Sequence, residues 1–119
     1  MEIDEILTEL KGKICFSNSD FLEVFDDDTI NYILEGSKNL RIISISVSGV
    51  DAPKKAAQEA AKNINDGKIL IAEFITSSVF SLQELSEAAD ILVNPLAWGH
   101  VINEYENETC KLNIIFKEE

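Results

Sequence analysis

Hydrophobic and polar residues alternate along this chain with two periods, one typical of strands and one typical of helices. From Leu40 to Ser48, isoleucine and valine alternate with serine, which is the period of two of a half-buried strand. Residues 68–76 form a longer apolar run, and residues 112–116 alternate again. The pattern predicts strands at Lys13–Ser17, Leu40–Ser48, Lys68–Thr76 and around Leu112–Phe116.

Helical spacing of apolar residues separates these strands. Gly12 ends the first periodic segment, Asp28 or Thr29 caps a short one, and Asp51 with Pro53 begins an alanine-rich one. Ser81 and Glu84 form an S-x-x-E capping box. The predicted helices cover residues 3–10, 30–34, 51–64, 81–89 and 98–105, and residues 90–93 are either a further strand or the last turn of the fourth helix.

Alternation of strands and helices is typical of an α/β sheet with helices packed on it. We expect a single domain over residues 1–119, with a mixed or mostly parallel sheet of about four or five strands. The serines of Leu40–Ser48 qualify this picture, because a strand covered on both faces is usually apolar throughout. That strand is therefore predicted to lie at an edge of the sheet or to have one open face.

Charge is distributed unevenly along the chain. The formal net charge is −12, and no lysine or arginine occurs from Ile69 to Cys110. An acidic surface repels nucleic-acid phosphates and favours a basic protein partner, so direct nucleic-acid binding is not expected. Self-association is left open.

The location of the protein is predicted from what the sequence lacks. The first ten residues are acidic and periodic, and no apolar run approaches the length of a membrane span. Cys15 and Cys110 each lie in a predicted strand among apolar residues, where reduced core thiols are expected. We therefore expect a cytoplasmic protein without membrane contact.

Small polar residues come directly after the predicted strands. If the strands are mostly parallel, their carboxyl ends meet at one edge of the sheet, where open α/β sheets bind ligands. The candidate ligand-binding residues are Ser17, Asn18, Ser48, Asp51, Thr76, Ser77 and Asn94. The alternative is that serine, asparagine and aspartate are simply the residues that turns and helix starts require.

One aromatic-rich segment offers a candidate contact surface for a protein. On the predicted helix 98–105, Trp98 and Tyr105 share a face, and tryptophan and tyrosine are frequent at binding hot spots. The candidate partner-binding residues are Trp98, His100, Glu104, Tyr105 and Glu108. Trp98 is expected to be partly exposed because of the nearby glutamates, and the alternative is a buried core anchor.

Catalytic and metal-binding patterns are weak. The three aspartates at residues 26–28 lack a calcium-binding loop, and capping explains them better. His100 and Glu104 could meet on a helix, but a metal site or a general base needs further partners. No cofactor, metal ligand or catalytic residue is assigned.

Two functional hypotheses result. The first is a non-enzymatic acidic interaction or regulatory domain, either a subunit of a complex or an inhibitor-like binder of a basic protein. The second is a small-ligand-binding α/β module, with weak enzymatic activity at most, that uses the polar strand ends.

Overall fold

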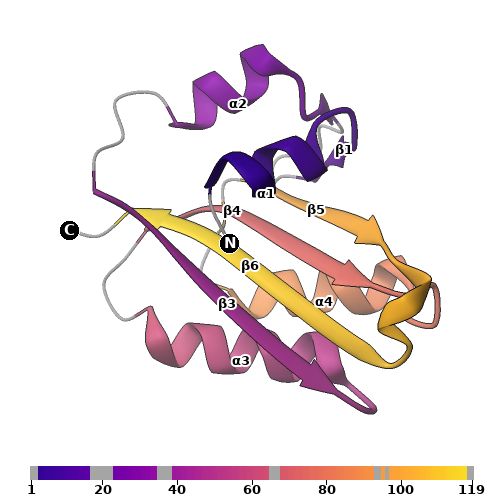
Figure 1. The fold of residues 1–119 in the computed structure, drawn as a ribbon. Helices are drawn as coiled ribbons and strands as arrows, with labels where there is room; N and C mark the ends of the chain where they lie inside the picture. Colours follow the sequence, from indigo (N-terminus) through magenta and orange to yellow (C-terminus); the bar gives the residue numbers. More distant parts are fainter. Residues whose placement is uncertain are drawn as a thin grey trace.

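The fold is built on a four-stranded mixed sheet with four α-helices, as Figure 1 shows. The computed structural model describes residues 3–16, 23–34, 39–64, 68–92, 95 and 97–117, without the side chains of Cys15 and Glu23. The helices are α1 (Ile3–Leu10), α2 (Asp27–Leu34), α3 (Ala52–Asn63) and α4 (Leu82–Ile91), and a 3-10 turn, η1, covers Glu104–Glu106. The strands are β1 (Ile14–Cys15), β2 (Glu23–Val24), β3 (Leu40–Ser48), β4 (Lys68–Thr76), β5 (Ala97–Ile102) and β6 (Thr109–Lys117).

The strand order in the sheet is β3-β6-β4-β5. Strand β6 pairs antiparallel with both β3 and β4, and β4 pairs parallel with β5. Strands β3, β4 and β5 therefore all run in one direction, and β6 runs against them. The fold class predicted from the sequence, one α/β domain with a mixed sheet, is confirmed.

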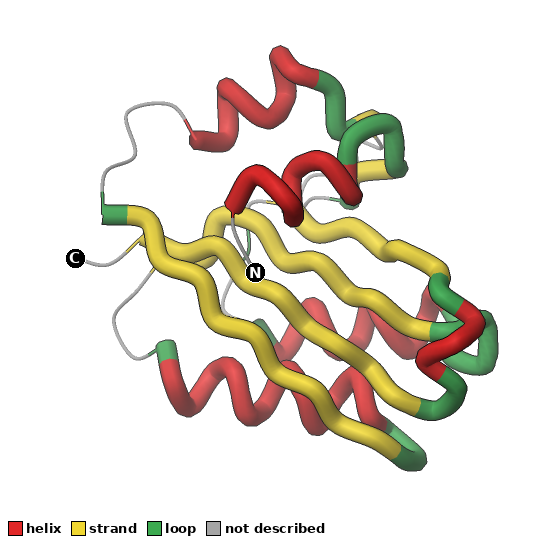
Figure 2. Tube along the Cα trace, in the orientation of Figure 1, coloured by secondary structure: helices red, strands yellow, loops and turns green. Residues whose placement is uncertain are grey.

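Helices cover both faces of the sheet (Figure 2). On the first face, α3 and α4 pack side by side on the larger core, which contains Phe74, Leu112 and Ile114. The alanines of α3, Ala56, Ala57 and Ala60, are fully buried, and their small side chains let the helix lie close to the sheet. This is the alanine stripe that the sequence predicts.

On the second face, α1 and α2 pack on a smaller core that includes Ile71, Ala97 and Ile115. Helix α1 buries Ile6 and Leu10 and is followed by Gly12, whose φ of 84° is the left-handed conformation expected after a helix. Residues 3–16 and 23–34, which include α1, β1, β2 and α2, are called the N-terminal layer below.

Gly99 of β5 allows this layer to approach the sheet. A Cβ atom at this position would lie 2.7 Å from Leu10 Cδ2 and 2.8 Å from Phe25 Cε2. Both side chains are fully buried, so neither can move aside easily. A glycine in a strand interior marks such a close approach.

The serine-rich strand has the environment that its pattern predicts. Strand β3 lies at an edge of the sheet, and Ser44, Ser46 and Ser48 are exposed while its isoleucines and valine are half-buried. The predicted edge position is confirmed, whereas the alternative of an open sheet face is not, because helices pack on both faces.

Residues 98–105 do not form the predicted helix. Residues 97–102 are strand β5, and only Glu104–Glu106 form a short 3-10 turn. The helical interpretation was wrong because Trp98, His100 and Ile102 also fit a period of two, and because pairing with β4 stabilises the extended form. Gly99 and the β-branched pair Val101 and Ile102 are poor helix formers and favour the strand.

The other differences concern element ends. Helix α2 begins at Asp27, and Asp26 caps it by accepting a hydrogen bond of 2.7 Å from Thr29 N, whereas Asp28 or Thr29 was the predicted cap. This bond lowers the pKa of Asp26. Residues 90 and 91 form the end of α4, and β1 is only two residues long. Among the described residues, no helix is both long and apolar enough to cross a membrane.

Candidate functional site

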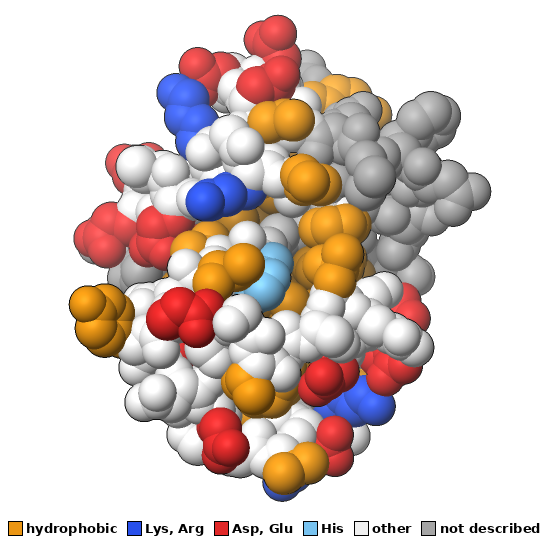
Figure 3. Space-filling model, turned by 90° about the vertical axis from the view of Figure 1, so that its right-hand side faces the viewer, with side chains coloured by type: hydrophobic (Ala, Val, Ile, Leu, Met, Phe, Trp, Pro, Cys, Tyr) orange, Lys and Arg blue, Asp and Glu red, His pale blue; other side chains and the backbone are white. Residues whose placement is uncertain are grey.

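The parallel direction of β3, β4 and β5 brings their carboxyl ends to one edge of the sheet. Ser48 ends β3, Thr76 ends β4 and Ile102 ends β5, and β6 begins beside them at Thr109. This convergence is the geometric condition on which the predicted ligand site depends. Figure 3 views the molecule from this end.

Short hydrogen bonds connect the loops at this edge. Ser48 Oγ lies 2.7 Å from Thr109 Oγ1, and the Ser77 hydroxyl donates to the main-chain carbonyl of Asn107. The main-chain N–H of Ser78 and its hydroxyl both donate to the Glu104 carboxylate, at 3.0 and 3.1 Å. The polar groups of two predicted ligand-binding residues, Ser48 and Ser77, are therefore already bonded to neighbouring loops.

Thr76 and His100 form a buried pair across β4 and β5. Thr76 Oγ1 donates to the Ser77 carbonyl at 2.9 Å and lies 2.7 Å from His100 Nε2. Because the hydroxyl has one hydrogen, Nε2 carries the ring proton and donates to Thr76, which leaves Nδ1 as an acceptor. Burial lowers the pKa of His100, so the ring is neutral at pH 7.

Asp51 is the N-cap residue of α3. Its backbone is in the left-handed region, with φ of 62°, and its side chain makes no capping hydrogen bond. The predicted N-cap position of Asp51 is confirmed, and the side chain stays free of a capping hydrogen bond. The residue is exposed and belongs to the surface of this edge.

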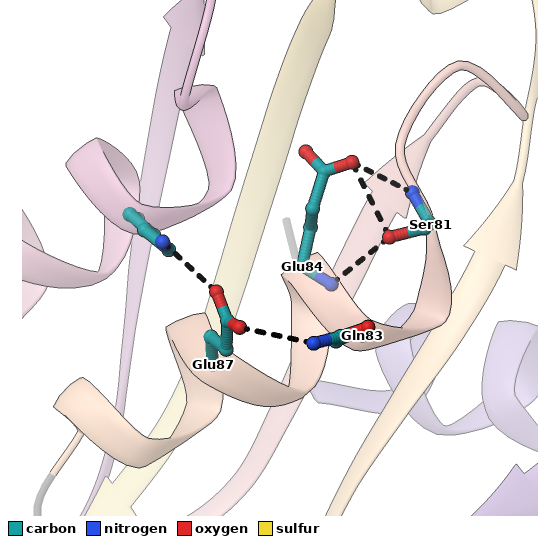
Figure 4. A network of polar contacts seen from close by, with 5 residues as sticks. Ser81, Gln83, Glu84 and Glu87 are labelled. Atoms are coloured by element: carbon teal, nitrogen blue, oxygen red, sulfur yellow. Dashed lines mark hydrogen bonds and ion pairs between the residues drawn. The ribbon is translucent and has the colours of Figure 1, made fainter.

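Helix α4 begins with the predicted capping box (Figure 4). Glu84 N donates to Ser81 Oγ at 3.1 Å, and Ser81 N donates to Glu84 Oε1 at 3.3 Å. One turn later, Glu87 accepts from Gln83 and forms a 2.9 Å ion pair with Lys54 of α3. This ion pair lowers the pKa of Glu87 and raises that of Lys54. It joins the two helices beside the candidate site.

Three open hollows lie at this end of the sheet. The largest, about 670 Å³, is lined by Ser77, Ser78, Glu104, Asn107, Glu108 and Thr109. A small one of about 160 Å³ lies between Val50, Asp51, Val79 and Glu108. The third, about 400 Å³, is lined by Lys13, Ile14, Phe16, Leu82, His100 and Ile102 and is called the His100 groove below.

Large apolar side chains and carboxylates share this end. Val50, Val79, Leu82, Ile102 and Tyr105 are each between 51% and 95% exposed. Together with Asp51, Glu104 and Glu108 they are called the strand-end face below. Figure 3 shows the histidine surrounded by hydrophobic side chains, with carboxylates around them.

The predicted ligand-binding residues are only partly assembled. Ser48, Asp51, Thr76 and Ser77 lie together at the strand-end edge. Ser17, Asn18 and Asn94 lie outside the described residues. Residue 94 precedes β5, whereas the carboxyl end of a strand is formed by the residues after it. The grouping of Asn94 depended on a possible strand at residues 90–93, and residues 90 and 91 form the end of α4 instead.

The predicted partner-binding residues are divided between the core and the surface. Glu104, Tyr105 and Glu108 lie near η1, and His100 is half-buried. Trp98 is only 7% exposed, so the expected partial exposure is wrong. Its ring stacks on Phe16 with centroids 4.4 Å apart and meets Phe74 edge-on at 5.7 Å. Trp98 is therefore a core anchor, which was the alternative interpretation of this residue.

Glu73 was not predicted as a special position. This residue lies in the middle of β4, is fully buried, and accepts a 2.8 Å hydrogen bond from Asn113 Nδ2. The available signal was a single carboxylate inside the apolar run of residues 68–76. Such a residue is almost never fully buried without a partner.

The described residues offer no metal cluster and no activated thiol. No three histidine, cysteine, aspartate or glutamate side chains among them are grouped to hold a metal ion. Cys110 is free and buried, and burial together with Glu106 raises its pKa to about 12. A thiol with this pKa is protonated at neutral pH and is a poor nucleophile.

Comparison with known proteins identifies a shared fold. No protein-family model and no curated protein matches the sequence. Among solved structures, an empty FtsZ dimer from M. jannaschii has a TM-score of 0.66, and a mutant of FtsZ from M. jannaschii has 0.63, both at 14% sequence identity. The similarity covers 78% of this chain but only 31% and 32% of those chains. At this identity, it shows the fold alone.

Proposed function

We propose that this protein is a non-enzymatic binding domain whose strand-end face holds a basic segment of a protein partner. The protein acts either as a subunit of a larger complex or as an inhibitor-like binder. The observation that carries this proposal is the combination of exposed apolar side chains and carboxylates on one face. Neither feature alone would distinguish the face from an ordinary surface.

The apolar part of the face consists of two groups of side chains that line hollows at this end of the sheet. Val50 and Val79 line the same small hollow, and Val79 also borders the largest one. Leu82 and Ile102 line the His100 groove, whose lining is largely apolar. Single exposed hydrophobic residues are normal on proteins, but contiguous apolar patches with a polar rim mark sites of interaction.

The charge of the face supports a basic partner. The four ion pairs described for the chain use Asp27, Glu59, Glu87 and Glu106 rather than the carboxylates of this face. Positive charge is also present near this end, since Lys13 lies at the far wall of the His100 groove and Lys111 is paired with Glu106 of η1. Carboxylates at the rim of an interface raise the rate of association with a basic partner and disfavour acidic ones.

Binding is favoured over catalysis because the reactive groups at this edge are occupied. The Thr76 hydroxyl binds both His100 and the Ser77 carbonyl, and the hydroxyls of Ser48 and Ser77 are bonded to neighbouring loops. A nucleophile needs a base that takes its proton, and that base needs a third group to orient it. In the Thr76–His100 pair, Nε2 donates to the hydroxyl, and the hydroxyl proton is used by the Ser77 carbonyl, so the histidine is not placed to take that proton.

The proposal is tested by capture of proteins from a native lysate with the immobilised chain. The face variant combines Val79→Ser with Glu108→Lys, which changes the apolar hollow and the charge together. The matched control combines Tyr32→Ser, at an exposed aromatic site on α2, with Glu59→Lys on α3. Circular dichroism verifies that both variants fold.

We expect the wild-type chain and the control to retain the same partner, and the face variant to lose it by about tenfold or more. Capture should weaken as salt rises from about 50 to 300 mM, because screening shortens the reach of surface charges. Equal capture by all three proteins would contradict the proposal. So would a chain that retains nothing at low salt.

The alternative function, a small-ligand module, is supported by one observation, the 670 Å³ hollow at the ends of parallel strands. Glu104 and Glu108 at its wall favour a neutral or cationic ligand. A thermal-shift screen separates the two functions, since a ligand at about a hundred times its dissociation constant stabilises the fold by about 2.7 kcal/mol.

A further inference from the structure

A carboxyl group is buried at the centre of the sheet, away from the strand-end face. Glu73 lies between Asn113 of β6 and Gly99 of β5 and has no exposed surface. Asn113 Nδ2 donates to Glu73 Oε1 at 2.8 Å, and Ser44 Oγ donates to Asn113 Oδ1 at 2.7 Å. The second carboxyl oxygen, Oε2, has no hydrogen-bond partner among the described residues. A buried oxygen without a partner is costly and unusual.

The nearest ionisable group belongs to the helix that covers it. Helix α1 buries Ile6 and Leu10 against the sheet, and its half-buried Glu9 lies close enough to Glu73 to contribute to the raised pKa of that carboxyl. Two ionised carboxylates are both acceptors and repel each other. One proton between them turns the contact into a hydrogen bond and gives Oε2 a partner.

No described positive charge offsets this pair. Helix α2 buries Ile30 and Ile33, and β5 and β3 contribute the uncharged Gly99 and Ser44. On the same face of β6, Lys111 lies two residues from Asn113, but its ammonium is paired with Glu106 at 3.1 Å. Only Asn113 stabilises the ionised form of Glu73.

We propose that Glu73 and Glu9 form a proton-controlled latch that holds the N-terminal layer on the sheet. With a shared proton, α1 is closed over Ile71 and Ile115. When the proton is lost, the repulsion between the carboxylates and the cost of a buried charge favour lifting of α1. Lifting hydrates Glu73 and uncovers the apolar second face of the sheet.

The proton affinity of Glu73 places this change near neutral pH. Burial raises its pKa to about 7, Glu9 contributes to the rise, and the Asn113 bond opposes both. The closed state therefore binds the proton more tightly than an open state in which the ordinary value of 4.5 applies. Closure is most stable at acidic pH, loses stability as pH rises from about 4.5 to 7, and stays weakened above 7.

The layer is attached in a way that permits local opening. The link between α1 and β1 contains Gly12, and the ion pair between Lys11 and Asp27 is exposed. Exposed ion pairs contribute little to stability. Helices α3 and α4 pack on the opposite face with a separate core, so they need not move when α1 lifts.

Hydrogen exchange of the full chain, read by mass spectrometry and corrected for the intrinsic effect of pH, tests the latch. We expect protection of α1 to fall on the order of tenfold between about pH 5.5 and pH 8, because the open state is favoured once the proton is lost. Protection of α3 and α4 should stay constant and serves as the internal reference. Glu73→Gln should keep α1 protected at all pH values.

Two further variants make the test specific. Glu9→Gln should reduce the pH response, since an amide donates to the Glu73 carboxylate without carrying charge. Glu5→Gln, on an exposed part of the same helix, should behave as the wild type. If Glu73→Gln does not fold, carbon-detected NMR of wild-type Glu73 replaces it. A carboxyl titration midpoint below about pH 5, or α1 protection that does not change with pH, would overturn the proposal.

Discussion

Replacement of Trp98 by alanine is the sharpest test of how the core is built. The indole stacks on Phe16 and meets Phe74 edge-on, and only 7% of the residue is exposed. Loss of a buried tryptophan side chain costs about 3–5 kcal/mol, through lost transfer energy and the cavity that remains. A domain of this size has a free energy of unfolding of about 5–15 kcal/mol, so a large part of its stability is at risk.

The assay is urea unfolding followed by far-UV circular dichroism, because the variant lacks the tryptophan signal. With an m value of about 2 kcal/mol per molar urea, the midpoint should fall by about 2 M. Tyr105→Ala is the matched control, since that ring is 95% exposed and its loss should change stability by less than about 0.5 kcal/mol. In the wild type, iodide should not quench the indole fluorescence. Quenching as efficient as that of free tryptophan, with a midpoint unchanged in Trp98→Ala, would refute this description of the core.

Two other substitutions test local features. Gly99→Ala places a Cβ atom 2.7 Å from Leu10 Cδ2, so it should destabilise the protein by about 1–3 kcal/mol. Hydrogen exchange should rise in α1 more than in α3, and an equal rise in the two helices would contradict this explanation. Ser81→Ala removes the acceptor of the α4 capping box and should cost about 1 kcal/mol in urea unfolding, with Ser86→Ala, an exposed site in the middle of the same helix, as the control.

Prediction from sequence succeeded where one face of an element is buried and the local signals agree. The bounds of β3 and β4 match the predicted ranges, because alternation or a continuous apolar run together with flanking turn residues defines a strand. The capping box at Ser81 located the start of α4 in the same way. Each of these elements is specified by residues close together in the chain.

Local spacing did not resolve β5, because its residues fit two periods. Trp98, Val101 and Ile102 lie on one face of a helix, and Trp98, His100 and Ile102 lie on one face of a strand. Pairing with β4, which comes earlier in the chain, decides between them, and such long-range pairing is not visible in local spacing. Because a helix was predicted here, Trp98 was expected at the surface. In strand β5 its ring instead points into the larger core.

The sequence predicted where the candidate site lies but not whether its polar groups are available to bind a ligand. Strand direction could be inferred coarsely from alternating elements, and this located Ser48, Thr76 and Ser77 at one edge. Whether their hydroxyls are available depends on Thr109, Asn107 and His100, which come from other segments. The partners of a polar group depend on the tertiary structure, so a ligand site could not be distinguished in advance from a set of mutually bonded loops.

Strand β5 connects the proposed latch with the proposed binding face. Gly99 faces Leu10 and Phe25 of the N-terminal layer, and the next residue, His100, lines the groove on the other face. The opposite wall of that groove, Lys13, Ile14 and Phe16, comes directly after α1 in the chain. Two main-chain bonds between Phe16 and Trp98, 2.9 and 2.8 Å long, hold one end of this wall to β5.

If α1 lifts as proposed, the Lys13 end of this wall, which follows α1 in the chain, should move with it, and partner binding should then depend on pH. We expect the wild-type chain to retain its partner several-fold more strongly at about pH 6 than at about pH 8 at constant salt. Burial lowers the pKa of His100, and the Glu73→Gln variant keeps this histidine, so comparison of the two proteins separates any contribution of His100 from that of the latch. The Glu73→Gln variant should retain the partner equally at pH values of about 6 and about 8, because its latch stays closed. If the pH effect is of the same size in the wild type and in Glu73→Gln, the latch does not control binding. The effect would then belong to carboxylates of the strand-end face or to the partner.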